Sequence, residues 1–177
     1  MSPTPPLSET VRINEIGAGL TRRLEPDAAA RKTIAKALDL ASLDAFVADL
    51  SLAPAPGPAQ TGWRLTGRVT AEAVQTCGLT LEPLPVSIDE RFSIDLVQAT
   101  SMATDEIEVD IDIDDNAPDM IEDGKVDLGQ YAVEQLALTL DPFPRKPGAE
   151  FVQPEEPREI SPFAVLKSLR PQNNGEG

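Results

Sequence analysis

Four successive stretches in the middle of the chain alternate apolar and polar residues, and this period of two limits the fold more than any other feature. Successive side chains of a β-strand point to opposite faces, so each stretch predicts a strand with one buried face. No helical pattern separates the stretches, which favours an antiparallel meander. The apolar positions are Phe46, Ala48, Leu50 and Leu52; Trp63, Leu65, Val69 and Ala71; Val86, Ile88, Phe92, Ile94 and Leu96; and Ile107, Val109, Ile111 and Ile113.

A further strand is expected near the N-terminus, from Val11 and Ile13, with Leu20 as an additional candidate. Glu90 occupies an apolar position of the third stretch, which predicts either a β-bulge or a place at the rim of the sheet. The sequence therefore predicts a single α+β domain. Its antiparallel sheet has about five strands, could curl toward a barrel and is flanked by two helices.

Both expected helices begin at an aspartate that can cap them. Asp27 precedes residues 28–38, with Ile34, Ala37 and Leu38 facing inward. Asp127 precedes a helix over 127–140, where Gln130 is placed to reach back to the cap as in a capping box. The apolar face of this second helix consists of Leu128, Ala132, Val133, Leu136 and Leu140. The sequence Asp141-Pro142-Phe143-Pro144 then ends it, because proline lacks the backbone donor and disfavours helical geometry before it.

The formal net charge of -15 is unevenly distributed along the 177 residues. Residues 1–36 contain six Lys and Arg against four Asp and Glu, whereas residues 82–127 contain two against fifteen. The acidic region would repel RNA, so a direct RNA-binding module would have to use the basic N-terminal third. RNA could approach there around Arg22, Arg23, Arg31, Lys32 and Lys36. Arg31, Lys32 and Lys36 lie on the first expected helix, where their charges indicate either a solvated face or a partner site.

The chain contains no histidine and one cysteine. This composition excludes catalysis by Ser-His, Cys-His and His-metal arrangements, and leaves a metal-assisted carboxylate hydrolase as the remaining enzymatic alternative. No internal disulfide can form, and no apolar run approaches the length of a membrane span, so a cytoplasmic protein is expected. We expect a flexible N-terminus over 1–9, a domain over 10–151, and a tail rich in Pro and Glu over 152–177 that could form a short helix near 163–169.

Three segments carry a family resemblance: Cys77-Gly78-Leu79-Thr80-Leu81-Glu82-Pro83, the stretch from Asp127 to Phe151, and Pro162-Phe163-Ala164-Val165-Leu166. In these residues the chain resembles the YceD family, the large ribosomal RNA subunit accumulation proteins, and is most similar to the alphaproteobacterial type. The resemblance spans roughly Val11 to Leu169. It implies a role in bacterial 23S ribosomal RNA accumulation or processing, and it supplies no catalytic residue.

The same resemblance raises the question of a metal at Cys77. Many relatives outside the alphaproteobacteria have a metal-binding pattern, with paired cysteines near this position and another after the proline-rich helix end. Here Thr80 stands three residues after Cys77, and residues 144–151 contain neither cysteine nor histidine. One thiolate cannot provide the four ligands of a structural zinc site, so we expect a small buried thiol, no metal and no cofactor.

Three groups of residues are candidates for partner binding. The acidic row Glu106, Glu108, Asp110 and Asp112 could protect a sheet edge or meet a cationic partner. The same region begins like a calcium loop, but Asp115 and Ile121 replace the glycine and glutamate that such a loop requires. The second group, Phe143, Arg145 and Lys146, follows the second helix. On that helix, Tyr131 and Leu138 could pack under the proline-rich segment, or they could form a docking patch with Phe143.

The third group, Phe163, Leu166 and Leu169, lies in the tail. These residues could form a linear motif that orders on binding, or fold back onto the domain. The function that the resemblance implies is a non-enzymatic accessory factor in ribosome biogenesis, specifically of the large subunit. Given the charge, its expected partner is a basic ribosomal protein or an rRNA-processing factor.

Overall fold

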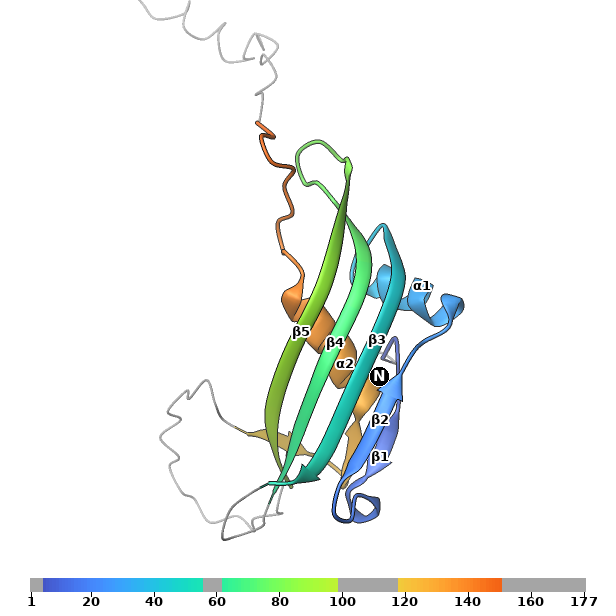
Figure 1. Ribbon diagram of the computed structural model, residues 1–177, viewed down its shortest axis with the longest axis vertical. Helices are drawn as coiled ribbons and strands as arrows, with labels where there is room; N and C mark the ends of the chain where they lie inside the picture. Colours follow the sequence, from blue (N-terminus) through green and yellow to red (C-terminus); the bar gives the residue numbers. More distant parts are fainter. Residues whose placement is uncertain (1–4, 56–61, 99–117, 151–177) are drawn as a thin grey trace, which may run out of the picture.

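The computed structural model describes residues 5–55, 62–98 and 118–150. Three long strands form most of a tall, curved sheet, with helix α2 crossing one face and helix α1 beside the other elements (Figure 1). In chain order the strands are β1 (Thr10–Arg12), β2 (Leu20–Leu24), β3 (Ser42–Pro54), β4 (Gly62–Thr76), β5 (Pro83–Gln98), β6 (Asp119–Ile121) and β7 (Lys125–Asp127). The helices are the 3₁₀ turn η1 (Ile13–Glu15), α1 (Ala28–Ala37) and α2 (Leu128–Thr139).

The main sheet has the order β2-β3-β4-β5-β6, and β1 pairs with β7 in a separate two-stranded sheet. This arrangement confirms the α+β prediction. The main sheet is open. The described strands therefore do not close into a barrel, which the sequence had allowed as one outcome. Its pairings are antiparallel except between β5 and β6, which run parallel. The predicted strand around Ile107–Ile113 lies outside the described residues.

The inward faces of the long strands agree with the predicted alternation. Phe46, Ala48, Leu50 and Leu52 of β3 are buried, as are Leu65, Val69 and Ala71 of β4. Strand β5 pairs with β4 from Pro83 to Val97 without a register shift, and Glu90 lies exposed opposite Val69. The bulge is therefore wrong, and Glu90 lies on a part of β5 that pairs with β4 alone among the described strands. A register shift occurs instead in β3, between Leu43 and Ala45.

The N-terminal strand prediction was wrong in its extent. Val11 belongs to β1 and Leu20 to β2, which lie in different sheets, while Ile13 begins the turn η1. The chain reverses between them at Gly17 and Gly19, whose φ angles of 55° and 150° suit glycine. The alternation of Val11, Ile13 and Leu20 could not reveal this reversal.

Both aspartate caps are confirmed. Asp27 accepts a hydrogen bond from the backbone N–H of Ala30 at 2.8 Å. Ile34 is buried in α1 and Leu38 is half-buried, but Ala37 is exposed and Ala35 takes its place in the core. Asp127 accepts from the backbone N–H groups of Gly129 and Gln130 at the start of α2.

The predicted capping box is wrong, because the Gln130 side chain donates to Glu134 instead. The N-terminal segment occupies this end of the helix. The Ser8 hydroxyl and the Glu9 backbone N–H donate to the Asp127 carboxylate at 2.6 and 2.8 Å, and the Leu128 N–H donates to the Glu9 carbonyl. Residues just before β1 thus pack against the first turn of α2.

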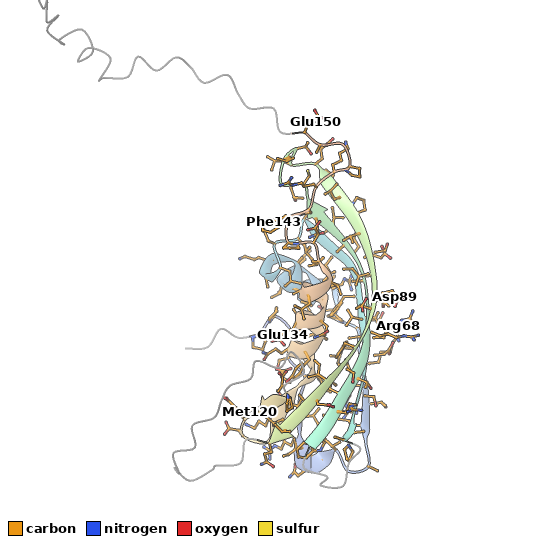
Figure 2. All side chains as sticks on the ribbon, turned by 90° about the vertical axis from the view of Figure 1, so that its left-hand side faces the viewer. Arg68, Asp89, Met120, Glu134, Phe143 and Glu150 are labelled. Carbon is orange, nitrogen blue, oxygen red and sulfur yellow. The ribbon has the colours of Figure 1, made fainter. Side chains whose placement is uncertain are left out.

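Helix α2 lies on the concave side of the sheet (Figure 2). Its buried face is the predicted one, with Leu128, Ala132, Val133 and Leu136 in the core and Leu140 packed against it. Glu134 points away from the sheet in the same view. The helix thereby covers the apolar residues on the concave face of β3, β4 and β5.

Replacing Gly129 by alanine tests whether the N-terminal segment packs on α2. A Cβ atom at Gly129 would lie 2.9 Å from backbone atoms of Leu7 and Glu9, which is too close. Alanine usually stabilises a helix by about 1 kcal/mol relative to glycine, but here we expect Gly129→Ala to lower the free energy of unfolding by about 1–3 kcal/mol. Denaturant titration measures the difference.

Gly78→Ala provides the matched control, because the nearest atom to a Cβ there is the Pro144 carbonyl oxygen at 3.8 Å. Its effect should stay within about 0.5 kcal/mol. A stabilising effect of Gly129→Ala would contradict the packing of the N-terminal segment.

Candidate interaction site at the end of helix α2

Two segments that are far apart in the sequence meet beyond the C-terminal end of α2, and we call them together the helix-end site. They are the turn Cys77–Glu82, which connects β4 to β5, and the segment Asp141–Gly148. The Gly78 backbone N–H donates to the Pro144 carbonyl at 2.9 Å, and the Gln75 amide donates to the Asp141 carbonyl at 2.8 Å. Lys146 Nζ contacts both carboxylate oxygens of Glu82 at 3.0 Å. These contacts fix the proline-rich segment to the sheet.

Cys77 links the two segments through its sulfur. The side chain is 0% exposed, which confirms the expected buried thiol. Its Sγ accepts hydrogen bonds from the backbone N–H of Thr80 at 3.5 Å and of Lys146 at 3.3 Å. Hydrogen bonding by the Thr80 side chain, then by the backbone N–H groups of Lys146, Thr80 and Leu79, lowers the Cys77 pKa to about 6 against the opposing effect of burial. Such hydrogen bonds favour the thiolate over the thiol.

Leu81 is held in an unfavourable conformation within the same turn. Its φ angle of 59° lies in the left-handed region, although its side chain is 76% exposed. The Leu81 N–H donates to the Cys77 carbonyl at 3.0 Å, and the Cys77 N–H donates to the Glu82 carbonyl at 2.9 Å. The turn therefore imposes the conformation. A non-glycine residue in this region costs roughly 1–2 kcal/mol, and such strain is concentrated at functional positions.

A groove of about 660 Å³ runs between the end of α1, the β4–β5 turn and the segment after α2. Phe143 contributes to it and is 77% exposed, as is Leu138 outside the groove. Exposed apolar side chains around a groove are typical of docking surfaces. The lining residues include the apolar Leu38, Leu79, Leu140 and Phe143 and the charged Asp39, Asp141 and Arg145.

The structure brings together only some of the predicted site residues. Phe143 and Arg145 line the groove, and Lys146 is engaged by Glu82. The acidic row from Glu106 to Asp112 and the tail residues Phe163, Leu166 and Leu169 lie outside the described residues. Sequence reasoning missed Leu79, Leu81 and Glu82 as parts of the site. Their only signal was their place in the segment that carries the resemblance.

Tyr131 and Leu138 have separate surroundings. Tyr131 is half-buried, and its hydroxyl donates to Asp119 Oδ2 at 3.1 Å. Burial, followed by the charge and hydrogen bond of Asp119, raises the Tyr131 pKa far above its usual range. Neither alternative for this pair holds for Tyr131, which packs against the core beside Asp119 of β6 and not under the proline-rich segment, and Leu138 remains on the surface.

The convex face of the sheet carries charged pairs across neighbouring strands. Arg64 Nε donates to Asp95 at 2.6 Å, and Arg68 Nε donates to Asp89 at the same distance. Figure 2 shows Arg68 and Asp89 on the side opposite α2. The arginine hydrogen bonds lower the pKa of both aspartates. Part of the charge between residues 82 and 127 is thus neutralised locally, which its sequence total did not indicate.

The basic N-terminal residues are likewise distributed over two elements. Arg22 and Arg23 lie in β2, where Arg22 approaches Glu9 at 3.7 Å and Arg23 contacts Asp49 at 2.9 Å. Arg31 donates to the Pro26 carbonyl at 2.9 Å, and Lys32 and Lys36 are exposed on α1. Carboxylates therefore already neutralise two of the five cations that an RNA would require.

Over residues 5–55, 62–98 and 118–150, no three metal-binding side chains are grouped closely enough to hold a metal ion. In the same ranges, no helix combines the length and apolar character needed to span a membrane.

The fold and the site together define an open-sheet α+β domain whose helix end presents a groove with both apolar and charged lining beside exposed leucines. A family model described as large ribosomal RNA subunit accumulation protein YceD matches residues 65–170, so the chain belongs to the YceD family. The matched residues include both segments of the helix-end site. No curated protein and no solved structure matches the chain.

The lowered pKa of Cys77 predicts a pH dependence of stability. An unfolded cysteine titrates at about 8.5, whereas Cys77 in the folded chain titrates at about 6. The thiolate therefore contributes stability that is complete above the unfolded pKa and is lost as the pH falls through the folded pKa. We expect the Tm difference between wild type and Cys77→Ala to grow as the pH rises from about 6 to about 9.

Thermal unfolding of both proteins across this pH range measures the effect. Cys77→Ser serves as the control, because its hydroxyl fills similar space without titrating, and it should lack the same pH-dependent increment. Parallel Tm profiles for all three proteins would show that the thiolate contributes nothing to stability.

Proposed function

We propose that this protein is a non-enzymatic accessory factor in large ribosomal subunit biogenesis, and that it supports the accumulation or processing of 23S ribosomal RNA. The match of residues 65–170 to the YceD family carries this proposal. The absence of histidine from the sequence, which removes the commonest general bases, supports a role without catalysis. The exposed side chains of Leu81 in the helix-end site and of Leu138 on α2 suit protein contacts.

The proposed contact with the ribosomal precursor is made through a protein. A net charge of -15 opposes approach to a polyanion, and the cations of β2 already have carboxylate partners. A basic ribosomal protein or rRNA-processing factor would instead be attracted to this chain. Direct contact with rRNA is then weak and sensitive to salt. This role places the protein in the cytoplasm, where ribosomal subunits assemble.

Affinity capture with and without nuclease tests the proposal. The tagged full chain is isolated from cells, one half of the extract is treated with nuclease, and the bound proteins are compared. We expect large-subunit precursor components in the untreated sample, and a basic partner that remains after nuclease treatment. Loss of every partner on nuclease treatment would favour the RNA-binding module, and the absence of precursor components would contradict the ribosomal role.

Charge variants identify the surface that attracts the partner. The variant Glu106→Gln, Glu108→Gln, Asp110→Asn and Asp112→Asn neutralises the acidic row, and we expect slower association with the captured partner and a weaker dependence on salt. The matched control is Glu15→Gln, Asp44→Asn, Glu122→Gln and Asp123→Asn, which changes the net charge equally at exposed positions. If the two variants have equal effects, overall charge accounts for the attraction. If association is unchanged, the acidic row does not bind the partner, and edge protection remains its role.

A further inference from the structure

We propose that residues 162–170 of this same chain dock in the groove of the helix-end site, with Phe163, Leu166 and Leu169 against its apolar wall. The groove joins elements that are distant in the sequence, since Leu38 follows α1, Leu79 lies in the β4–β5 turn and Phe143 follows α2. This docking is independent of which partner the proposed function uses.

The groove presents apolar surface that needs an occupant. Phe143 lies beside Leu79 and Leu140 in the groove wall, yet 77% of its surface remains exposed. The surrounding backbone is fixed by the hydrogen bonds of Gly78 and Lys146, so the side chain cannot be buried by a local shift of the segment. Removing an aromatic side chain from water is favourable, and this favours a ligand that covers Phe143.

Residues 162–170 have the sequence of such a ligand. Phe163, Leu166 and Leu169 recur every three residues, the spacing that places side chains along one side of a short helix. Lys167 and Arg170 add positive charge, and the groove contains Asp39 and Asp141. Glu155, Glu156 and Glu159 precede the segment, whereas Arg145 also lines the groove. Both signs of charge therefore have a counterpart.

The connection between the groove and the segment is short. The described chain leaves the helix-end site at Glu150, close after Lys146, and Figure 2 places Glu150 at the same end of the domain as Phe143. The residues between Glu150 and Phe163 can span up to roughly 40 Å when extended. A tether of this kind gives an effective concentration in the millimolar range, so a weak interaction is sufficient for docking. The family match also extends to residue 170, so the family model covers this segment together with the β4–β5 turn and the segment after α2.

Paramagnetic relaxation in the full chain tests the proposal. A nitroxide is attached at Ser168→Cys, on the side of the helical pattern opposite Leu166, while the buried Cys77 is retained. We expect the amide signals of Gln75, Leu79 and Phe143 to lose most of their intensity. The signals of β1, toward the other end of the domain (Figure 1), should keep theirs. Wild type treated with the same reagent shows whether Cys77 reacts.

Three labelled variants make the result specific. The triple variant Phe163→Ser, Leu166→Ser, Leu169→Ser should return the amide signals of the groove to full intensity. Phe143→Ser should return them in part. Leu138→Ser is the matched control, because Leu138 is also 77% exposed but does not line the groove, and it should leave the broadening unchanged.

Each contrary result overturns intramolecular docking in the groove. No localised broadening would show that the segment does not dock. Broadening that increases with protein concentration would show that the occupant comes from a second copy. An equal effect of Leu138→Ser and Phe143→Ser would place the contact outside the groove. None of these outcomes affects the capture of ribosomal precursor components, so a failure here is distinguishable from a failure of the proposed function.

Discussion

Helix α2 on the concave face of the sheet is the interaction on which the rest of the structure depends. The buried residues Leu128, Ala132, Val133 and Leu136 cover the inner surfaces of the long strands. The N-terminal segment fixes the first turn of the helix through Asp127, and Gln75 of β4 holds the Asp141 carbonyl at the other end. The position of the segment after α2 therefore follows from the packing of the helix, and with it the position of the groove.

The Cys77 sulfur completes this arrangement. It accepts backbone hydrogen bonds from Thr80 in the β4–β5 turn and from Lys146 after α2, and so joins two segments that the sheet alone would leave apart. The exposed ion pair between Lys146 and Glu82 adds little stability of its own but fixes the same approach. Strain at Leu81 and exposure of Phe143 then result from a framework that is rigid around them.

The sequence predicted the elements whose signals are local and periodic. The faces of β3, β4 and α2 and the two aspartate caps follow from alternation, helical spacing and capping chemistry. Long-range geometry was less accessible: the parallel pairing of β6, the separate β1–β7 sheet and the Ser8 contact with Asp127 depend on where distant segments meet. The same holds for the site. Phe143 and Lys146 were identified by their place after the helix, whereas no residue pattern indicates the left-handed φ angle of Leu81. Local ion pairs such as Arg68 with Asp89 likewise cannot be read from regional charge totals.

The ratio of large-subunit to small-subunit ribosomal RNA, in cells of the source organism that lack this protein, tests the account most directly. If the protein supports accumulation of the large-subunit RNA, the ratio should fall in these cells, and the wild-type chain should restore it. Precursor RNA should change together with the ratio if processing is the affected step. A normal ratio and normal precursor levels, under conditions in which the protein is normally produced, would contradict the assignment to large-subunit biogenesis.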